Sequence, residues 1–507
     1  MEGDAAAGYR AVPGAPPPGW WRGGEPQVWA NAAAVSISLI AVVGLLGLLA
    51  TRGLAHFWPQ PLVQMETQYQ GDERTILGEI VSRERVSAQQ LREAGWQLDS
   101  TQDRERSLIR RGVREAYAAD YAWVIEDYIV SQTRPAEAVT VERYSGGKLF
   151  GYIEALYEEG EQAGPNPDSP ASAWDRLQLL LQTTEDERAG ADTLSRAEYT
   201  IRLADGGALT LPLKNVVRMY RPNDLGSVEK ITIYGAKLWE FMSTGPREAN
   251  SEGGVFPAIF GTVMMVILMS IIVMPFGVVA AVYLREYASQ GLLTRLIRIA
   301  VNNLAGVPSI VYGIFGLGFF VYFLGGEIDQ LFFSDTLPSP TFGTPGLLWS
   351  SLTLALLTLP VVIVATEEGL ARIPATLREG SMALGATRAE TLRRVVIPAA
   401  SPAIMTGLIL AVARAAGEVA PLMLVGVVKV APSLPVDGTF PYLHLDQKFM
   451  HLGFHIYDVG FQAPNVEAAR PLVYATALLL VVIIAVLNIT AVTLRNRIRE
   501  RYKALES

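Results

Sequence analysis

The sequence predicts an α-helical polytopic membrane protein with an α+β insert outside the membrane. Six apolar runs are long enough to span a bilayer, since a spanning helix needs about 20 mostly apolar residues. Residues 51–250, which separate the first run from the second, hold most of the charge and contain no comparable run. The predicted transmembrane helices are 29–50, 255–283, 299–324, 347–366, 401–426 and 470–494.

The composition narrows the classes of function. The chain has 507 residues, a formal net charge of −8 and no cysteine. The absence of cysteine excludes disulfide bonds and thiolate metal sites. The acidic balance argues against a nucleic-acid partner, because domains that bind nucleic acids are usually basic.

Basic residues in the short loops predict the orientation. Arginines gather after the second and fourth runs and in the tail after the sixth, whereas residues 325–346 contain no Lys or Arg. Cytoplasmic loops carry this excess of positive charge, so both termini are expected in the cytoplasm and the insert on the exterior or periplasmic side. The predicted segments are a disordered N-terminus (1–28) rich in Ala, Gly and Pro, the first helix (29–50), the insert (51–250), the membrane core (251–494) with a cytoplasmic loop at 367–400, and a basic tail (495–507).

Local patterns in the insert predict a mixed domain. Residues 75–97 and 104–131 have helical spacing of apolar positions, while 199–213 alternates and turns at Asp205–Gly207, which is typical of a β-hairpin. Residues 231–234 read as a further strand. No catalytic constellation stands out, so we expect a docking or structural domain.

The loop between the fourth and fifth spans contains two helix-start patterns. Thr376-x-x-Glu379 and Thr387-x-x-Glu390 each match a capping box. Gly385 lies between them, where the end of a helix favours a left-handed residue. The sequence therefore predicts a short helix, a glycine turn and a second helix, before Pro398 restarts the chain toward the fifth span.

The first of these helices presents apolar side chains among charges. Leu377, Met382 and Leu384 stand beside Arg378 and Glu379. Such an apolar knob suits a groove on another protein. The alternative is an ordinary cytoplasmic loop with two helical turns.

A resemblance decides between these readings. The pattern resembles the EAA loop of ABC importer permeases, with small or conservative changes at four positions; the matching residues are Glu379, Gly380, Ser381, Gly385, Val395, Ile397 and Pro398. In that family the loop is the coupling helix that docks on the ATPase subunit. The residues that the resemblance assigns to ATPase coupling are Arg378, Glu379, Gly380, Ser381, Leu384, Gly385, Thr387 and Pro398.

Four further segments narrow the resemblance. Residues 275–287, 302–316, 366–387 and 413–426 look like the A-type permeases of phosphate-specific ABC transporters (PstA). This implies a type I permease fold in a bacterial inner membrane and a role in phosphate transport, which makes the chain a transporter subunit and not an enzyme. The implied partners are a C-type permease, a dimer of ATPase subunits that hold ATP and Mg, a periplasmic phosphate-binding protein and membrane lipid. The large insert departs from the typical member.

Two charges fall inside the fifth apolar run. A mid-membrane arginine costs roughly 2.5–3.5 kcal/mol on insertion scales, so Arg414 must face protein or a wet pathway. Glu418 follows at the i+4 position and can pair with it. The pair is either a structural link between helices or a fixed positive charge for a passing oxyanion, since a guanidinium fork suits phosphate. The predicted pathway residues are Arg414, Glu418, Asn302, Asn303 and Ser309; packing against a partner permease is the preferred role of the two asparagines.

The energy source lies outside this chain. Lys148 follows SGG, but Glu142 replaces the first glycine of a P-loop and Leu149 replaces its Ser or Thr, so no nucleotide cofactor is expected here. His451 and His455 have helical ligand spacing without the glutamate of a zinc-protease motif, and no metal is expected. Residue chemistry leaves sulfate and molybdate open beside phosphate. A membrane sensor with an exterior domain and a stand-alone secondary transporter are the rival classes.

Overall fold

The structure is a computed structural model that describes residues 25–69, 72–96, 102–112, 117, 119–163, 170–186, 196–250, 252–463 and 465–503. Within this part of the chain, six helices are long and apolar enough to cross a membrane, which confirms the predicted number of spans. Residues 1–24 of the predicted disordered N-terminus lie outside the described residues. The six spans are Pro26–Phe57, Phe256–Tyr287, Ser309–Phe332, Leu347–Ala371, Arg388–Ala415 and Val466–Arg497.

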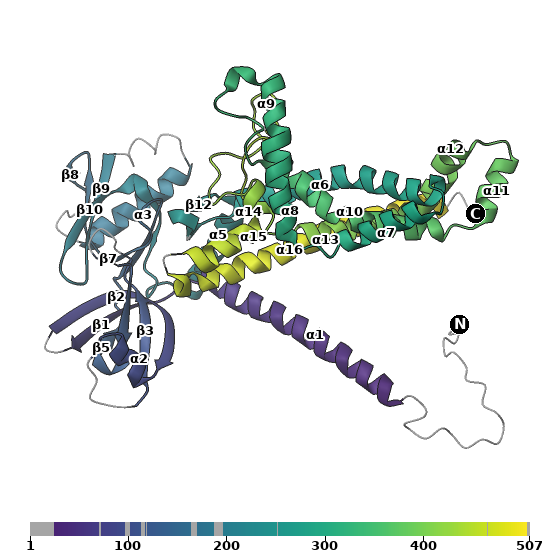
Figure 1. Cartoon of the computed structure of the whole chain (residues 1–507). Coiled ribbons are helices and arrows are strands. Elements are labelled where there is room, and N and C mark those ends of the chain that lie inside the picture. Colours follow the sequence, from purple (N-terminus) through teal and green to yellow (C-terminus); the bar gives the residue numbers. More distant parts are fainter. Residues whose placement is uncertain are drawn as a thin grey trace, which may run out of the picture.

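The insert and the loop between the fourth and fifth spans occupy opposite ends of the molecule (Figure 1). The two short helices of that loop are α11 (Ala375–Ala383) and α12 (Arg388–Thr391). α1 (Glu25–Leu54) and α16 (Val466–Lys503) each have one end at the insert and extend away from it. The strand-rich insert and the helical bundle together confirm the predicted fold class.

The first half of the insert is an antiparallel sheet with strand order β4-β3-β2-β1-β5. The predicted helices at 75–97 and 104–131 are wrong, because only α2 (Ala88–Glu93) and a single 3-10 turn (Glu126–Tyr128) are helical in their described residues. β2 pairs with strands on both sides, and this pairing overrides the local helical spacing. The strands are β1 (Leu62–Tyr69), β2 (Asp72–Val86), β3 (Arg104–Arg110), β4 (Tyr121–Ile125) and β5 (Ile129–Thr133).

The second half of the insert is a sheet with strand order β10-β9-β7-β6-β11, to which β8 adds at β7. Buried and solvent-facing residues alternate along β9, so that Tyr199 and Ile201 enter the core while Glu198 and Arg202 stay exposed. Leu177 of α3 (Pro170–Asp186) joins the same core. The strands are β6 (Val139–Arg143), β7 (Leu149–Glu158), β8 (Glu161–Gln162), β9 (Ala197–Arg202), β10 (Ala208–Pro212) and β11 (Val216–Tyr220).

The predicted β-hairpin at 199–213 is confirmed. β9 and β10 pair antiparallel, and the Leu203 amide donates to the Gly207 carbonyl at 2.7 Å across the turn. Gly206 has φ +88°, a conformation that favours glycine.

The predicted strand at 231–234 is wrong, because these residues lie within α5 (Ser227–Ser243). Glu229 supplies the start signal by accepting a hydrogen bond from the Gly226 amide at 2.8 Å. A segment of four residues is too short to distinguish a strand from a turn of helix.

Ion pairs fix the second sheet of the insert to α5, the last helix before the membrane part. Glu142 of β6 contacts Lys237 of α5 at 2.6 Å and Arg218 of β11 at 3.0 Å. Burial alone would raise the pKa of Glu142, but the charges of Lys237, Lys148 and Arg218 hold this pKa well below its usual value. Lys148 also pairs with buried Glu79 of β2 at 2.9 Å.

α10 (Leu347–Ala371) is the central helix of the bundle and packs on α6 (Phe256–Val282) and α13 (Ile397–Ala415). Small residues permit these close contacts, since a Cβ on Gly277 would lie 2.6 Å from Cγ1 of Val362. Gly369 and Gly407 make equally close approaches to Ala403 and Ala365. Close helix packing through small residues is typical of membrane proteins.

The third and fifth spans differ from the predicted boundaries. Residues 299–304 belong to a separate helix, α7 (Leu292–Leu304), and the third span begins at Ser309. Pro308 causes this break, because proline lacks an amide hydrogen and disfavours helical geometry in the residue before it. The fifth span ends at Ala415 instead of 426.

The first span stands apart from the bundle over most of its length. α1 diverges from the other helices in Figure 1, and its side chains along the membrane are almost all exposed. The contact lies at its end, where a Cβ on Gly53 would lie 2.7 Å from the Ala475 amide nitrogen of α16. Just beyond it, the Phe57 ring packs on Phe241 of α5 with centroids 5.0 Å apart.

The remaining elements connect the spans. α8 (Ser309–Phe315) continues into a π-helical stretch (Gly316–Gly325) and α9 (Gly326–Phe332). The segment between the fifth and sixth spans contains α14 (Leu422–Val425) and α15 (Leu452–Tyr457). Short strands β12 (Pro246–Arg247) and β13 (Glu252–Gly253) precede α6.

Candidate functional site

The hairpin formed by α11 and α12 turns at the predicted glycine. Gly385 has φ +90°, and its amide donates to the Met382 carbonyl at 2.9 Å. The Ala386 amide donates to the Ser381 carbonyl at 3.3 Å, so the last carbonyls of α11 are satisfied by the turn itself. The predicted glycine turn is therefore confirmed.

One of the two predicted capping boxes is present. Oγ1 of Thr387 accepts from the Glu390 amide at 3.2 Å, and Oε2 of Glu390 accepts from the Thr387 amide at 2.9 Å. The box at Thr376 and Glu379 is wrong, because α11 already begins at Ala375 after Pro374. Thr376 thus lies inside the first turn, where its hydroxyl is past the capping position.

The outer face of α11 is apolar and open. The side chains of Leu377 and Met382 are each nearly half exposed, and Leu384 is 91% exposed. Glu379 and Gly380 are exposed beside them. Exposure of a leucine to water is unfavourable, and covering it with another apolar surface is favourable. This face therefore has the character of a docking surface.

Two of the predicted coupling residues point back into the protein. Nη2 of Arg378 lies 3.0 Å from Oε1 of Glu286 and also donates to the Leu370 carbonyl at 2.8 Å. The hydroxyls of Ser381 and Thr391 are 2.9 Å apart. Arg378 therefore ties α11 to the end of the second span and to α10, and Ser381 ties α11 to α12.

Pro398 does not restart the chain as predicted. The fifth span runs without interruption from Arg388 to Ala415, and Pro398 lies in the first turn of α13. A π-helical turn at Leu392–Val396 precedes it. Widened turns of this kind accommodate backbone groups that a proline leaves unpaired. Motion of α12 would thus pass directly into the membrane span.

The predicted pair of charges lies at a helix end and is loosely held. Arg414 occupies the last turn of α13, and Glu418 follows in the turn after Ala415. Nε of Arg414 is 3.8 Å from Oε1 of Glu418, which exceeds the range of a hydrogen bond. The Arg414 side chain is 35% exposed. The arginine therefore retains donors that a ligand could use.

The turn after Glu418 packs on the start of the third span. A Cβ on Gly313 of α8 would lie 2.7 Å from Cα of Pro421, and Ser309 opens the same helix. The hydroxyl of Tyr312 donates to the Leu304 carbonyl at 2.6 Å across the Pro308 break. The structure thus brings the Ser309 helix to the segment that follows Glu418.

The two predicted pathway asparagines lie on α7 and not on the helix that carries Arg414. Asn302 and Asn303 are exposed on α7, and Asn302 lines a cavity of about 200 Å³ with Arg298 and Glu367. Nε of Arg298 is 2.6 Å from Oε1 of Glu367, which joins α7 to α10. The pairings of Arg298 with Glu367 and of Arg378 with Glu286 do not follow from sequence spacing, because the partners are far apart along the chain.

The described residues contain no group of three or more potential metal ligands. His451 and His455 are buried, the first at the N-cap of α15 and the second within it, and Nδ1 of His451 accepts from the Gly453 amide at 3.1 Å. His451 is therefore the helix cap.

Comparisons with known proteins place the similarity in the membrane part. The family model described as "Binding-protein-dependent transport system inner membrane component" matches residues 273–501. The "Probable ABC transporter permease protein YqgH" of Bacillus subtilis is 35% identical over 214 residues, covering 41% of this chain and 65% of that protein. The "Phosphate transport system permease protein PstA 1" of Mycobacterium tuberculosis is 33% identical over 258 residues, covering 51% of this chain and 75% of that protein. A "Probable phosphate transport system permease protein PstA" of Methanocaldococcus jannaschii is 31% identical over 240 residues, covering 46% of this chain and 74% of that protein.

Proposed function

Because the chain belongs to the family of binding-protein-dependent transport system inner membrane components, we propose that it is a permease subunit of an ABC importer for inorganic phosphate. Relatives named as phosphate transport permeases support phosphate as the substrate. The observation that carries the coupling role is the exposed apolar face of α11, with Leu384 at its tip.

The hairpin of α11 and α12 docks on a separate ATPase subunit, which binds ATP and Mg²⁺. Leu377, Met382 and Leu384 supply the apolar contact. Closure of an ATPase dimer moves the hairpin, and Arg378 transmits the movement to the ends of the second and fourth spans through its contacts with Glu286 and Leu370. α12 passes the same movement into the fifth span.

The pathway forms between this chain and a second, C-type permease, so that each supplies half of it. Arg414 offers a fixed positive charge to the anion, and Glu418 limits how tightly the anion is held. Conduction requires binding that is weak enough to release the ion. Asn302 and Asn303 contribute packing against the partner, while Ser309 lines the pathway near its helix start.

The protein spans the bacterial inner membrane with both termini in the cytoplasm. The basic loops and the position of the α11–α12 hairpin at the end opposite the insert support this orientation. The insert then lies in the periplasm, where a phosphate-binding protein docks and delivers the ion.

ATP-dependent uptake by the reconstituted complex tests the function. Proteoliposomes that contain this chain, the second permease, the ATPase and the binding protein should accumulate labelled phosphate, with little competition from sulfate or molybdate. Preferred uptake of sulfate or molybdate would reassign the substrate within the same transporter class. Uptake by this chain alone, driven by an ion gradient, would overturn the proposal.

A further inference from the structure

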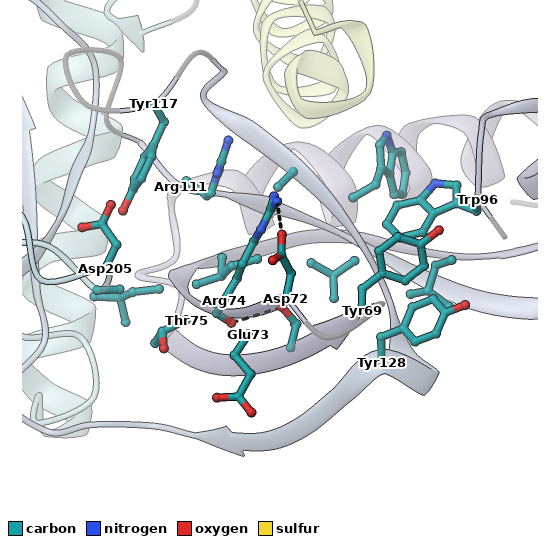
Figure 2. Close-up of a pocket in the computed structure, with 18 of the residues that line it drawn as sticks. Tyr69, Asp72, Glu73, Arg74, Thr75, Trp96, Arg111, Tyr117, Tyr128 and Asp205 are labelled. Atoms are coloured by element: carbon teal, nitrogen blue, oxygen red, sulfur yellow. Dashed lines mark hydrogen bonds and ion pairs between the residues drawn. The ribbon is translucent and has the colours of Figure 1, made fainter.

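A large cavity opens on the insert, away from the membrane-spanning helices. Its volume is about 890 Å³, within the range of ligand-binding clefts. Its walls come from the ends of β1 and β2, from β4, from residues 94–96 after α2 and from the β9–β10 turn, and Figure 2 shows the residues that line it. Nothing in the transport mechanism uses this cavity.

One end of the cavity is aromatic. The rings of Tyr69, Trp96 and Tyr128 lie together in Figure 2, with centroids 5.0 Å apart for the two tyrosines and 5.1 Å apart for Tyr69 and Trp96. Trp96 and Tyr128 are stacked with centroids 6.1 Å apart. Because each ring contacts the other two and is only partly buried, the cluster presents a fixed apolar wall, in which Tyr69 stands edge-on to Trp96 and Tyr128.

The other end is polar. The Tyr117 hydroxyl lies near the Asp205 carboxylate in Figure 2, and burial together with the Asp205 charge raises the pKa of Tyr117 to about 12, so the phenol stays protonated. The Arg111 guanidinium lies 4.6 Å from the Tyr117 ring centroid and donates to the Ala119 carbonyl at 3.0 Å. Nε of Arg111 is buried and has no hydrogen-bond partner in the structure. This end therefore offers both donors and acceptors.

The charges of the cavity disfavour an anionic ligand. The carboxylates of Asp72, Glu73 and Asp205 outnumber the guanidiniums of Arg74 and Arg111. Arg74 already pairs with Asp72 at 3.1 Å. A phosphorylated ligand would thus meet net negative charge.

The ring geometry disfavours an organic cation. A cage for an ammonium group needs a gap between aromatic faces, but the three rings of Tyr69, Trp96 and Tyr128 are in contact with one another. An uncharged ligand with flat apolar faces and many hydrogen-bonding groups fits both ends. Sugar rings combine these two properties.

We propose that this cavity binds an uncharged oligosaccharide, with one sugar ring on the wall of Trp96 and Tyr128 and hydroxyl groups at Arg111 and Asp205. Arg111 donates to sugar oxygens, and the Asp205 carboxylate accepts from sugar hydroxyls. On the exterior face of the membrane, such a site links the transporter to the glycans around it.

Calorimetric titration of the purified full chain with the tetrasaccharides of N-acetylglucosamine and of glucose tests the site. We expect saturable binding of at least one of them, weakened roughly tenfold by Trp96→Ala and by Arg111→Gln. Trp239→Ala is the matched control, because Trp239 is 69% exposed on α5 outside the cavity and should leave binding unchanged.

Asp205→Asn provides a second test should Trp96→Ala fail to fold, because Asp205 lies on an exposed turn. This variant should bind sugar more weakly and still support full phosphate uptake in the complex, which separates this site from the transport function. Absence of saturable binding by both sugars, equal binding by all variants, or displacement of the sugar by inorganic phosphate would each overturn the proposal.

Discussion

The guanidinium of Arg378, on the exposed hairpin, contacts the Glu286 carboxylate at the end of the second span at 3.0 Å. The two residues are 92 positions apart in the chain. Their side chains are 22% and 19% exposed, so the pair is largely shielded from water. It joins the α11–α12 hairpin to the bundle.

Arg378→Met should uncouple ATP hydrolysis from uptake. The substitution removes the contact with Glu286 and the hydrogen bonds to the Leu370 and Ile373 carbonyls. We expect a stability loss of about 1.5–3 kcal/mol, typical of a hydrogen bond to a charged group, and a lower ratio of phosphate transported to ATP hydrolysed. The double variant Arg378→Met with Glu286→Gln should regain stability without regaining coupling. Normal coupling in the single variant would contradict this role.

Gly385→Ala should weaken assembly with the ATPase. Its φ of +90° disfavours any side chain, at about 1–2 kcal/mol for a left-handed residue, although a Cβ there would meet open space. Gly235→Ala is the control, since that position is helical in α5, equally open and outside the hairpin, and alanine favours a helix by about 1 kcal/mol. Co-purification of the ATPase should fall in the first variant only. Equal recovery in both would show that the turn geometry is not needed for docking.

Leu384→Asp should reduce ATPase affinity without changing the melting temperature. A covered leucine contributes about 1.5–3 kcal/mol, which corresponds to at least tenfold in affinity. Val130→Asp is the control, because Val130 is 67% exposed on β5 at the opposite end of the molecule. Titration of the ATPase onto the immobilised chain measures the affinity. Unchanged affinity would place the docking surface elsewhere.

Arg414→Gln should abolish phosphate uptake while ATPase binding persists. The 3.8 Å separation from Glu418 leaves the guanidinium available to an anion, and glutamine keeps a similar length without the charge. Arg196→Gln makes the same change of charge on the insert, where Arg196 is 62% exposed, and should have no effect. Uptake at the normal rate in Arg414→Gln would leave only a structural role for the pair.

Acid should destabilise the segment around α15. Burial lowers the pKa of both His451 and His455 to about 4, from an ordinary value of 6.5. The unfolded chain therefore binds more protons than the folded chain between these values, and stability falls as the pH drops from 6.5 toward 4, by up to about 1.4 kcal/mol per pH unit for each histidine. Protonation would also displace the Gly453 amide from Nδ1 of His451.

Melting temperatures of the purified protein at pH 7 and pH 5 measure this effect. His451→Asn keeps an acceptor at the helix cap but does not titrate, so it should narrow the difference between the two pH values. A difference as large as that of the unchanged protein would exclude His451 as the acid-sensitive group.

The sequence alone predicts those features that depend on residues close together in the chain. Six spans follow from the length of apolar runs, and the turn at Gly385 and the cap at Thr387 follow from side chains close to one another in the chain. The break at Pro308 has the same local origin.

The sequence was insufficient where the signal is non-local. β2 resembles a helix by its spacing, and only its pairing with β1 and β3 makes it a strand. Arg378 was assigned to the docking face, but its partner Glu286 could not be found by spacing. The cavity on the insert joins residues as distant as Tyr69 and Asp205, which only the folded sheets bring together.

The contact between Phe57 and Phe241 has a consequence for how such a chain could have arisen. The chain leaves α1 and re-enters the bundle at neighbouring points, so the insert begins and ends at one place and does not change the topology of the helices. The insert could therefore be lengthened, shortened or exchanged during evolution without changing how the membrane-spanning helices are arranged.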